Sequence, residues 1–398
     1  MKILMISTDR KILEENSVVR QRVIQYGSLV EELRVIVFNL KKEINSKSLQ
    51  FTVDSLQKSQ IPNTNVFLYP TNSRNRWFYI FDAIRIGRKI IKNYKLKIKN
   101  SSNKNEILVT CQDPFETGLV GWCIARKTGA KLQMQIHTDF LSKYFVRESF
   151  LNRVRVCLAK FLLPKADGVR VVSERISQSL KTKNYKLKTE PIVLPVFVDI
   201  KEFEDKTPSF DLHQKYPQLN FIILMVCRLE KEKNVSLVIE AMSEIVKNNH
   251  KVGLVIVGDG SLLKSLQFTV NSLQLGNNVI FEGWQKDLFS YYKTVDLFLF
   301  TSNYEGYGMS LIEASASGCP ILTTDVGLVG SVLKEGDIKI CKTGDKDCFV
   351  AEIKKLLKDK LPLYDMSIKA RKRIEENVIK DKQEYLNKMK EGWEESIK

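Results

Sequence analysis

Two acidic side chains eight residues apart stand out in the second half of the chain. Glu305 lies beside Gly306 and Gly308, and Glu313 follows in a segment of helical pattern that begins near Met309. Glycines free the backbone to approach a ligand, and the first N–H groups of a helix are unpaired donors suited to phosphate or sugar oxygens. The stretch predicts an anion-binding turn, in which either carboxylate can accept hydrogen bonds from sugar hydroxyls.

Both acids also have a structural explanation. Glu305 can be an acid that the helix dipole stabilises at a helix N-terminus, and Glu313 can be a solvated residue on a helix surface. The explanation for Glu313 is weak, because its apolar neighbours Leu311 and Ile312 indicate a buried helix. An unpaired acid in such a helix would be costly.

Two basic residues follow the apolar run 221–226, which reads as a buried strand. Arg228 offers a planar fork of donors and Lys233 a point charge, and both can stabilise a departing nucleoside diphosphate as negative charge accumulates on it. Taken alone, a cation after a strand is more often a surface residue. The expected position of Arg228 and Lys233 opposite the Glu305 turn favours the functional interpretation.

Three further features follow expected strands. Gly258 and Gly260 form a tight turn that suits either a close-packed ligand or an ordinary strand-to-helix connection. Trp284 suits a nucleobase contact or a place in the core. His137 ends the run 131–136, where a polar contact to a sugar competes with a purely structural histidine.

Short apolar runs alternate with segments of helical period, which is typical of α/β domains with parallel sheets. We expect an N-terminal domain over 1–200, completed by a final helix at 378–398, and a C-terminal domain over 201–377, with a weakly patterned linker at 201–220. A ligand site belongs at the carboxyl ends of the strands, in the crevice between the two sheets. The expected strands are 2–6, 35–38, 66–68, 107–110, 131–136, 168–172 and 191–194, then 221–226, 253–257, 278–281, 297–300 and 320–323.

Charge and composition restrict the class of protein. Residues 1–200 hold 35 Lys and Arg against 17 Asp and Glu, whereas the rest is nearly neutral, so the first half favours anionic partners or a solvated basic surface. No apolar run reaches the length of a membrane span, and the first strand is too short for a signal peptide. Seven cysteines without a CxxC pair favour reduced thiols in the cytoplasm, and the three histidines lack metal-ligand spacing.

The motif order resembles glycosyltransferase family 4, most closely over 220–332 and more loosely in the first half. The resemblance implies the GT-B fold, two Rossmann-like doubly wound domains facing a central cleft. It implies a retaining, metal-independent transferase without a cofactor, whose C-terminal domain binds a nucleotide diphosphate-sugar and whose N-terminal domain binds the acceptor.

The resemblance also implies roles for individual residues. Glu313 is expected to bind the ribose, Arg228 and Lys233 the diphosphate, and Glu305 and His137 the donor sugar near the reacting carbon. The family's glycine-rich loop after the first strand is missing here, so we expect basic residues to compensate on the acceptor side. The donor-binding set is Arg228, Lys233, Gly258, Gly260, Trp284, Glu305, Gly306, Tyr307, Gly308, Met309, Ser310 and Glu313, and the acceptor side holds Arg10, Arg20, Arg22 and His137.

Partners and alternatives follow from the same features. Segment 74–81 mixes basic and aromatic residues, and seven more basic residues follow it up to Lys99. This pattern suits contact with a cytoplasmic membrane face, where a glycan or lipid-linked acceptor would be offered. It equally suits a core helix with solvated lysines. A nucleotide-sugar epimerase shares the expected architecture. A basic nucleic-acid-binding protein would need a recognition module that the sequence lacks.

Overall fold

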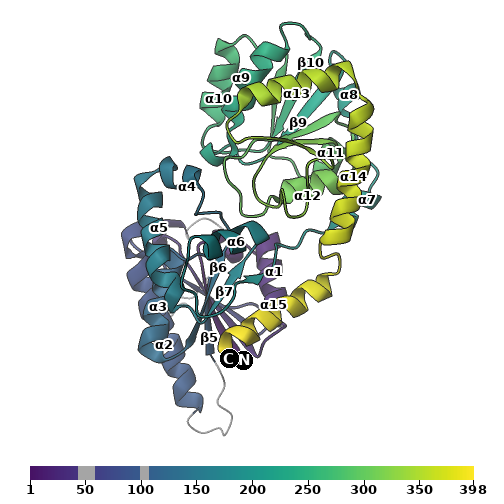
Figure 1. The fold of residues 1–398 in the computed structure, drawn as a ribbon. Helices are drawn as coiled ribbons and strands as arrows, with labels where there is room; N and C mark the ends of the chain where they lie inside the picture. The colour runs from purple at the N-terminus through teal and green to yellow at the C-terminus, as the bar shows by residue number, and fades with distance from the viewer. Residues whose placement is uncertain (44–58, 99–106) are drawn as a thin grey trace.

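A computed structural model describes residues 1–43, 59–98 and 107–398. Figure 1 shows two lobes, each built on a sheet flanked by helices, with the last two helices running from the second lobe back to the first. The expected fold class, two doubly wound parallel-sheet domains, is confirmed. The boundaries proposed at 200 and 377 stay a prediction.

The N-terminal sheet has the strand order β3-β4-β2-β1-β5-β6-β7-β8, and only β3 runs antiparallel to its neighbour. Its central strands are apolar and buried on both faces, as parallel strands covered by helices require. The strands are β1 (Lys2–Ser7), β2 (Glu32–Val37), β3 (Ser59–Gln60), β4 (Val66–Pro70), β5 (Ile107–Cys111), β6 (Lys131–Ile136), β7 (Gly168–Val171) and β8 (Ile192–Val193).

The C-terminal sheet has the order β11-β10-β9-β12-β13-β14, and all neighbouring strands are parallel. The short β14 had not been expected, because its three residues carry no clear pattern. The strands are β9 (Phe221–Val226), β10 (Val252–Val257), β11 (Val279–Gly283), β12 (Leu297–Phe300), β13 (Ile321–Thr324) and β14 (Lys339–Cys341).

Helices cover both sheets, and serine caps begin several of them. Ser142, Ser149 and Ser173 each accept a hydrogen bond from a backbone N–H of the first turn that follows. The helices of the first lobe are α1 (Val18–Gly27), α2 (Tyr79–Ile98), α3 (Glu116–Thr128), α4 (Lys143–Glu148), α5 (Phe150–Leu162) and α6 (Glu174–Thr182). Those that follow are α7 (Ile200–Asp205), α8 (Leu212–Lys215), α9 (Val235–Ile245), α10 (Leu263–Ser272), α11 (Leu288–Lys293), α12 (Met309–Ala316), α13 (Lys346–Lys358), α14 (Leu361–Asn377) and α15 (Lys382–Ile397).

Short 3-10 turns occur at Arg10–Leu13 (η1), Lys41–Glu43 (η2), Arg76–Phe78 (η3), Leu163–Lys165 (η4) and Lys231–Lys233 (η5). The expectation of an unpatterned linker at 201–220 is wrong in part, because α7 and α8 lie there. Ile200 and Leu212 are buried and anchor these helices, which are too short to show a helical period in the sequence.

The strand order defines where a ligand site belongs. In a doubly wound sheet the chain reverses direction between two neighbouring central strands, and the loops that leave those strands diverge. That point lies between β1 and β5 in the first sheet and between β9 and β12 in the second. The Arg228–Lys233 segment follows β9 and the Glu305 turn follows β12, so both leave the switch point of the second sheet.

The last helix returns to the first domain. α15 packs on β5, β6 and β7 (Figure 1). Its inward side chains Tyr385, Met389 and Trp393 join a core cluster with residues of β1 and β2. None of the helices in the described part of the chain is long and apolar enough to cross a membrane.

One disulfide links Cys341 at the end of β14 to Cys348 in α13. The expectation that all seven cysteines are reduced thiols is therefore wrong for this pair, which the turn between β14 and α13 brings within 5.8 Å between Cα atoms. The sequence did not show this because the spacing is not a CxxC motif. The other five cysteines are free.

The anchoring of α15 can be tested at Trp393. This indole is fully buried, packs edge-on against Tyr26, and has no partner for its Nε1–H among the described residues. We expect Trp393→Ala to lower the free energy of unfolding by about 3–5 kcal/mol, because it empties a large core site. Trp393→Phe keeps a ring and removes the unpaired donor, so urea unfolding should show a much smaller loss. Equal losses for the two variants would contradict the packing role.

Candidate active site

Lys233 and Glu305 form an ion pair that joins the loops after β9 and β12. Both side chains are largely buried, and Ser302 Oγ donates a second hydrogen bond of 2.9 Å to the same carboxylate oxygen of Glu305. The Lys233 ammonium also lies 5.6 Å from the centre of the Phe300 ring. The structure thus brings together two of the four charged residues on which the sequence analysis depends.

Backbone hydrogen bonds fix the two loops against each other. The Asn303 N–H donates to the Glu232 carbonyl at 2.7 Å, and the Thr301 hydroxyl donates to the Lys233 carbonyl at 2.9 Å. These bonds join segments about 70 residues apart in sequence. They do not involve the charged groups of Lys233 and Glu305, so they fix the two loops independently of the ion pair. The pair therefore lies on a preformed support.

Arg228 lies near this pair but does not join it. Its side chain is mostly exposed and forms an ion pair of 2.9 Å with Glu232, four residues later. Burial raises the thiol pKa of Cys227, the residue between β9 and Arg228, to about 12, while the nearby charges act on it in opposite directions. A thiol with so high a pKa is an inert part of the support.

Helix α12 presents its N-terminus directly behind the Glu305 turn. Gly308 precedes it with φ of 97°, a left-handed conformation that favours glycine, and supplies no side chain to cap the first N–H groups. Met309 and Ser310 occupy the first two positions, with Met309 exposed. Uncapped donors at a helix start suit an anion.

Glu313 lies in the middle of α12 and is half-buried. Tyr292 donates a hydrogen bond of 3.0 Å to its Oε2 atom, and Oε1 accepts none from the described residues. Burial raises the pKa of the Glu313 carboxyl, with a smaller contribution from the Glu202 charge, whereas the Tyr292 bond acts in the opposite direction. One carboxylate oxygen is therefore held by the protein and the other is available.

The Gly258–Gly260 turn packs against the loop after β9. A methyl group on Gly258, whose φ is 135°, would lie 1.9 Å from the Cys227 carbonyl oxygen, and one on Gly260 would lie 2.5 Å from that of Leu229. These glycines are required by backbone packing, which favours the structural interpretation of the turn. The Gly258 N–H donates to the Gly283 carbonyl and so places the next residue, Trp284, beside this turn.

The alternative that Trp284 belongs to the core is wrong, because 73% of its surface is exposed. Its neighbour Glu282 accepts hydrogen bonds from Lys215, Tyr216 and Tyr291, which fix the end of β11. An exposed indole on a fixed strand end offers a flat surface for stacking.

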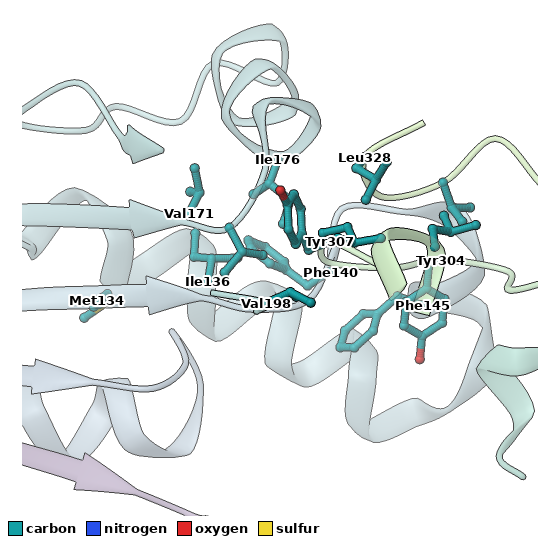
Figure 2. Packing of buried hydrophobic residues seen from close by; sticks show 14 of the residues in the cluster. Met134, Ile136, Phe140, Phe145, Val171, Ile176, Val198, Tyr304, Tyr307 and Leu328 are labelled. Carbon is teal, nitrogen blue, oxygen red and sulfur yellow. The ribbon is translucent and has the colours of Figure 1, made fainter. Parts of the chain in front are cut away.

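The turn after β12 also enters the first domain. Figure 2 shows Tyr307 among Ile136, Phe140 and Ile176, and Tyr304 beside Phe145. The rings of Tyr304 and Phe145 meet edge to face with centroids 5.5 Å apart, and the Tyr304 hydroxyl donates to Glu148 at 2.8 Å. Two aromatic side chains of one domain are thus embedded in the other.

Arg175 in α6 holds the neighbouring loop of the second domain. Its guanidinium donates to the carbonyls of Gly327 and Val329 at 3.2 and 2.7 Å and forms an ion pair with Asp325. The Tyr144 hydroxyl adds a bond of 2.9 Å to the Thr343 carbonyl. Polar bonds to the backbone therefore surround the apolar contact of Tyr304 and Tyr307.

Gly306 brings His137 to the site. A methyl group on Gly306 would lie 2.0 Å from the His137 carbonyl oxygen, so the two backbones touch across the domain junction. His137 is exposed to solvent, and nearby protein atoms remove part of the hydration of its ring. This desolvation, together with the charges of Arg170 and Arg22, lowers the pKa of His137 to about 3.

The imidazole of His137 is therefore neutral near pH 7. A histidine whose pKa is lowered by folding binds its proton more readily in the unfolded chain, whose value is about 6.5. The contribution of His137 therefore lowers the free energy of unfolding progressively as the pH falls from about 6.5 towards 3.

The three arginines expected on the acceptor side lie in different surroundings. Arg22 in α1 is close enough to His137 to affect its pKa. Arg20 donates from its side chain to the Leu13 carbonyl, and Arg10 is exposed and donates to the Tyr79 hydroxyl at 3.3 Å. In place of the missing glycine loop, Ser7 and the Thr8 N–H donate to Gln112 across the switch point of the first sheet.

Sequence reasoning missed several residues of the site and of the domain junction. Tyr292, Tyr304, Arg175 and Gln135 had not been singled out. A usable signal existed for Gln135, because a polar residue inside an expected buried strand needs a partner. Among the described residues, no group of three or more His, Cys, Asp or Glu side chains is arranged to hold a metal ion.

Residues 211–381 match the family model described as glycosyl transferases group 1. The alpha-monoglucosyldiacylglycerol synthase of Streptococcus pneumoniae is 27% identical over 75% of this chain and 68% of its own. An Escherichia coli UDP-Gal:alpha-D-GlcNAc-diphosphoundecaprenol alpha-1,3-galactosyltransferase is also 27% identical, over 82% of this chain and 84% of its own. These relatives are transferases, which confirms the expected enzyme class over the epimerase and nucleic-acid-binding alternatives.

Solved structures agree on the fold. An Anabaena protein, HepE, in complex with UDP and glucose superposes with a TM-score of 0.70 at 18% identity and covers 98% of each chain. A sucrose-phosphate synthase of Thermosynechococcus elongatus gives 0.72 at 19% identity over 98% of this chain and 97% of its own.

The contact between Gly306 and His137 can be tested with alanine. We expect Gly306→Ala to cost about 1–3 kcal/mol of unfolding free energy, because the new methyl group overpacks the domain junction. Gly276→Ala is the matched control, since a Cβ there meets nothing within 4 Å. Urea unfolding should leave the control at or above wild-type stability. Equal stability of the two variants would show that the backbones do not touch.

Proposed function

We propose that this chain, a glycosyltransferase of group 1 that takes its sugar from a nucleotide sugar, uses a UDP- or GDP-sugar. The sugar moves with retention of configuration to a hydroxyl of a glycan or lipid-linked acceptor. The observation that carries the proposal is the Lys233–Glu305 pair, supported by backbone hydrogen bonds and placed beside the uncapped start of α12. A cation, a carboxylate and free N–H groups at one switch point suit a diphosphate joined to a sugar.

In this proposal the diphosphate competes with Glu305 for Lys233. The ammonium and the N–H groups of α12 stabilise the negative charge on the leaving nucleoside diphosphate, and the exposed Arg228 closes on its outer side. These charges need no metal ion, so we propose a metal-independent reaction. Glu305, once freed from Lys233, faces the sugar and balances positive charge near the reacting carbon.

The nucleoside is assigned to Glu313 and Trp284. The Oε1 atom of Glu313 can accept a ribose hydroxyl while Tyr292 holds Oε2. Trp284 offers an exposed face to the base. UDP comes first among the nucleotides to test, since UDP or a UDP-sugar appears in the names of the HepE complex and the E. coli transferase.

Catalysis rests on position and electrostatics. Gly306, the residue after Glu305, touches the His137 backbone, and we propose that the neutral His137 ring and the Glu305 carboxylate both contact a sugar held at this junction. Departure of the phosphate and arrival of the acceptor hydroxyl on the same face of the sugar gives retention. We propose that Arg22, whose charge acts on His137, meets the acceptor.

Donor binding can be tested by thermal shift with UDP, GDP, UDP-glucose and GDP-mannose, in EDTA. A ligand that binds only the folded chain raises the melting temperature. We expect Glu313→Ala to weaken nucleotide affinity about tenfold, because a hydrogen bond to a charged acceptor is lost. Each shift is compared with the ligand-free melting temperature of the same variant.

Glu352→Ala is the control, since Glu352 is paired with Lys355 on the distant α13. An undiminished shift in Glu313→Ala would mean that Glu313 is structural. A shift that disappears in EDTA would overturn the metal-independent proposal.

A second part of the proposal concerns the acceptor and rests on the surface of the first domain. α3 packs between α2 and α5, and the starts of these outer helices expose large apolar side chains. Exposed arginines and lysines stand along α2. The apolar set is Trp77, Phe78, Phe81, Phe150, Leu151 and Val154, and the basic set is Arg74, Arg76, Arg85, Arg88, Lys89 and Lys92.

We propose that this surface rests on an anionic membrane that presents the acceptor. The alternative of a core helix with solvated lysines is not supported at its start, because Trp77 and Phe81 are 85% and 70% exposed. Apolar side chains ringed by basic ones suit the headgroup boundary, where each Lys or Arg contributes about 1 kcal/mol. Lys99 lies outside the described residues, and so do the side chains of Lys95 and Lys97.

Vesicle sedimentation tests the membrane proposal. We expect binding to phosphatidylglycerol vesicles but not to phosphatidylcholine vesicles, and a loss of about tenfold or more in the double variant Trp77→Ser, Phe81→Ser, because two apolar anchors leave the interface. Phe268→Ser is the control, since Phe268 is equally exposed on the other domain. Wild-type binding by the double variant would refute this surface.

A further inference from the structure

A chain of buried polar side chains runs beneath the first domain's half of the site, from α15 to His137. Its members lie on β5, β6 and β7 and are almost fully buried, so each needs a hydrogen-bond partner of the right kind. The members are Gln133, Thr110, Gln135 and Arg170. None of them has a role in the proposed function.

One end of the chain has a fixed polarity. The Gly392 carbonyl in α15 can only accept, so Gln133 must turn its Nε2 atom towards it, at 2.9 Å. Gln133 Oε1 then accepts from the Thr110 hydroxyl at 2.9 Å. The Thr110 oxygen in turn accepts from Gln135 Nε2 at 2.9 Å. The orientation of the Gln135 amide follows from these steps.

The Arg170 end of the chain fixes the same orientation of the Gln135 amide independently. Arg170 is 4% exposed, forms no ion pair among the described residues, and donates to the Leu194 and Pro195 carbonyls and the Tyr385 hydroxyl. A guanidinium can only donate, and its NH1 atom lies 3.0 Å from Gln135 Oε1. A flipped Gln135 amide would place two donors face to face, so Oε1 must point to Arg170.

His137 is the last link. Its Nε2 atom lies 3.0 Å from the same Gln135 Oε1. Since that oxygen can only accept, Nε2 must carry a proton, because a bare Nε2 would face a second acceptor. The Nδ1 atom accepts no hydrogen bond from the described residues, and His137 keeps an exposed surface.

We propose that Gln135 and Arg170 are positioning residues that hold His137 as its Nε2–H tautomer and leave Nδ1 as an acceptor for a hydroxyl of the bound sugar. The role of the sugar rests on the proposed function, whereas the tautomer does not. The lowered pKa of His137 agrees, since desolvation and, after it, the nearby Arg170 guanidinium keep the ring neutral. A neutral ring with one fixed lone pair can select the direction of a substrate hydroxyl.

The tautomer can be measured by long-range ¹H–¹⁵N NMR of the full-length protein labelled at histidine nitrogen. The chain has three histidines, so His213→Gln and His250→Gln complete the assignment. We expect wild-type His137 to show a protonated Nε2 and an unprotonated Nδ1. A protonated Nδ1, or averaged signals from both tautomers, would overturn the proposal.

Variants of the chain separate positioning from folding. Gln135→Met removes the acceptor at similar size, so the two tautomers should mix. Gln133→Met is the matched control, because it removes an equally buried glutamine that contacts α15 while Arg170 still orients Gln135. Gln135→Glu keeps an acceptor for both neighbours and should restore the Nε2–H form. An unchanged tautomer in Gln135→Met would overturn the proposal even if that variant is inactive.

Turnover gives a second readout, as release of nucleoside diphosphate from whichever of UDP-glucose and GDP-mannose raises the melting temperature. We expect Gln135→Met to lower kcat about tenfold while the donor KM changes little, and Gln135→Glu to recover most of the loss. Equal loss in Gln133→Met would oppose the proposal. A fixed tautomer without donor binding would instead count against the proposed function alone.

Discussion

The docking of one short turn into the neighbouring domain is the constraint on which the site depends. Tyr304 and Tyr307 pack into the first domain on either side of Gly306, whose backbone touches the His137 carbonyl. Burying two aromatic rings supplies the apolar stabilisation, and the bonds of Arg175 and Tyr144 fix the orientation. The same turn carries Glu305, so docking of the domains also sets the residue after Glu305 against the His137 backbone.

The charges at the site are arranged so that a ligand can replace protein contacts. Lys233 is neutralised by Glu305 and Arg228 by Glu232, which avoids a buried or crowded cation without a partner. In the proposed function, a diphosphate takes over these cations and releases the carboxylates. Backbone bonds between the two loops keep their positions during such an exchange, so little reorganisation is needed.

The two domains contribute different kinds of groups. The second supplies cations, carboxylates and helix N–H groups at the switch point between β9 and β12, whereas the first supplies a neutral histidine held by a buried polar network. That network reaches α15, the helix that crosses from one domain to the other. The final helix therefore closes the core of the first domain and also anchors the polar chain behind the site.

The sequence by itself determined the parallel strands, the positions of Glu305 and Lys233 after those strands and of Glu313 in a helix, and the basic character of the first half. Apolar periodicity and residue type are local properties. It did not show β3, β14, the helices of the linker or the disulfide, which are too short or too unpatterned to leave a signal. Only the tertiary structure decided that Lys233 pairs with Glu305 and Arg228 with Glu232, that Trp284 is exposed, and that Gln135 faces His137. Those contacts depend on how two sheets and two domains meet, and no local pattern encodes that geometry.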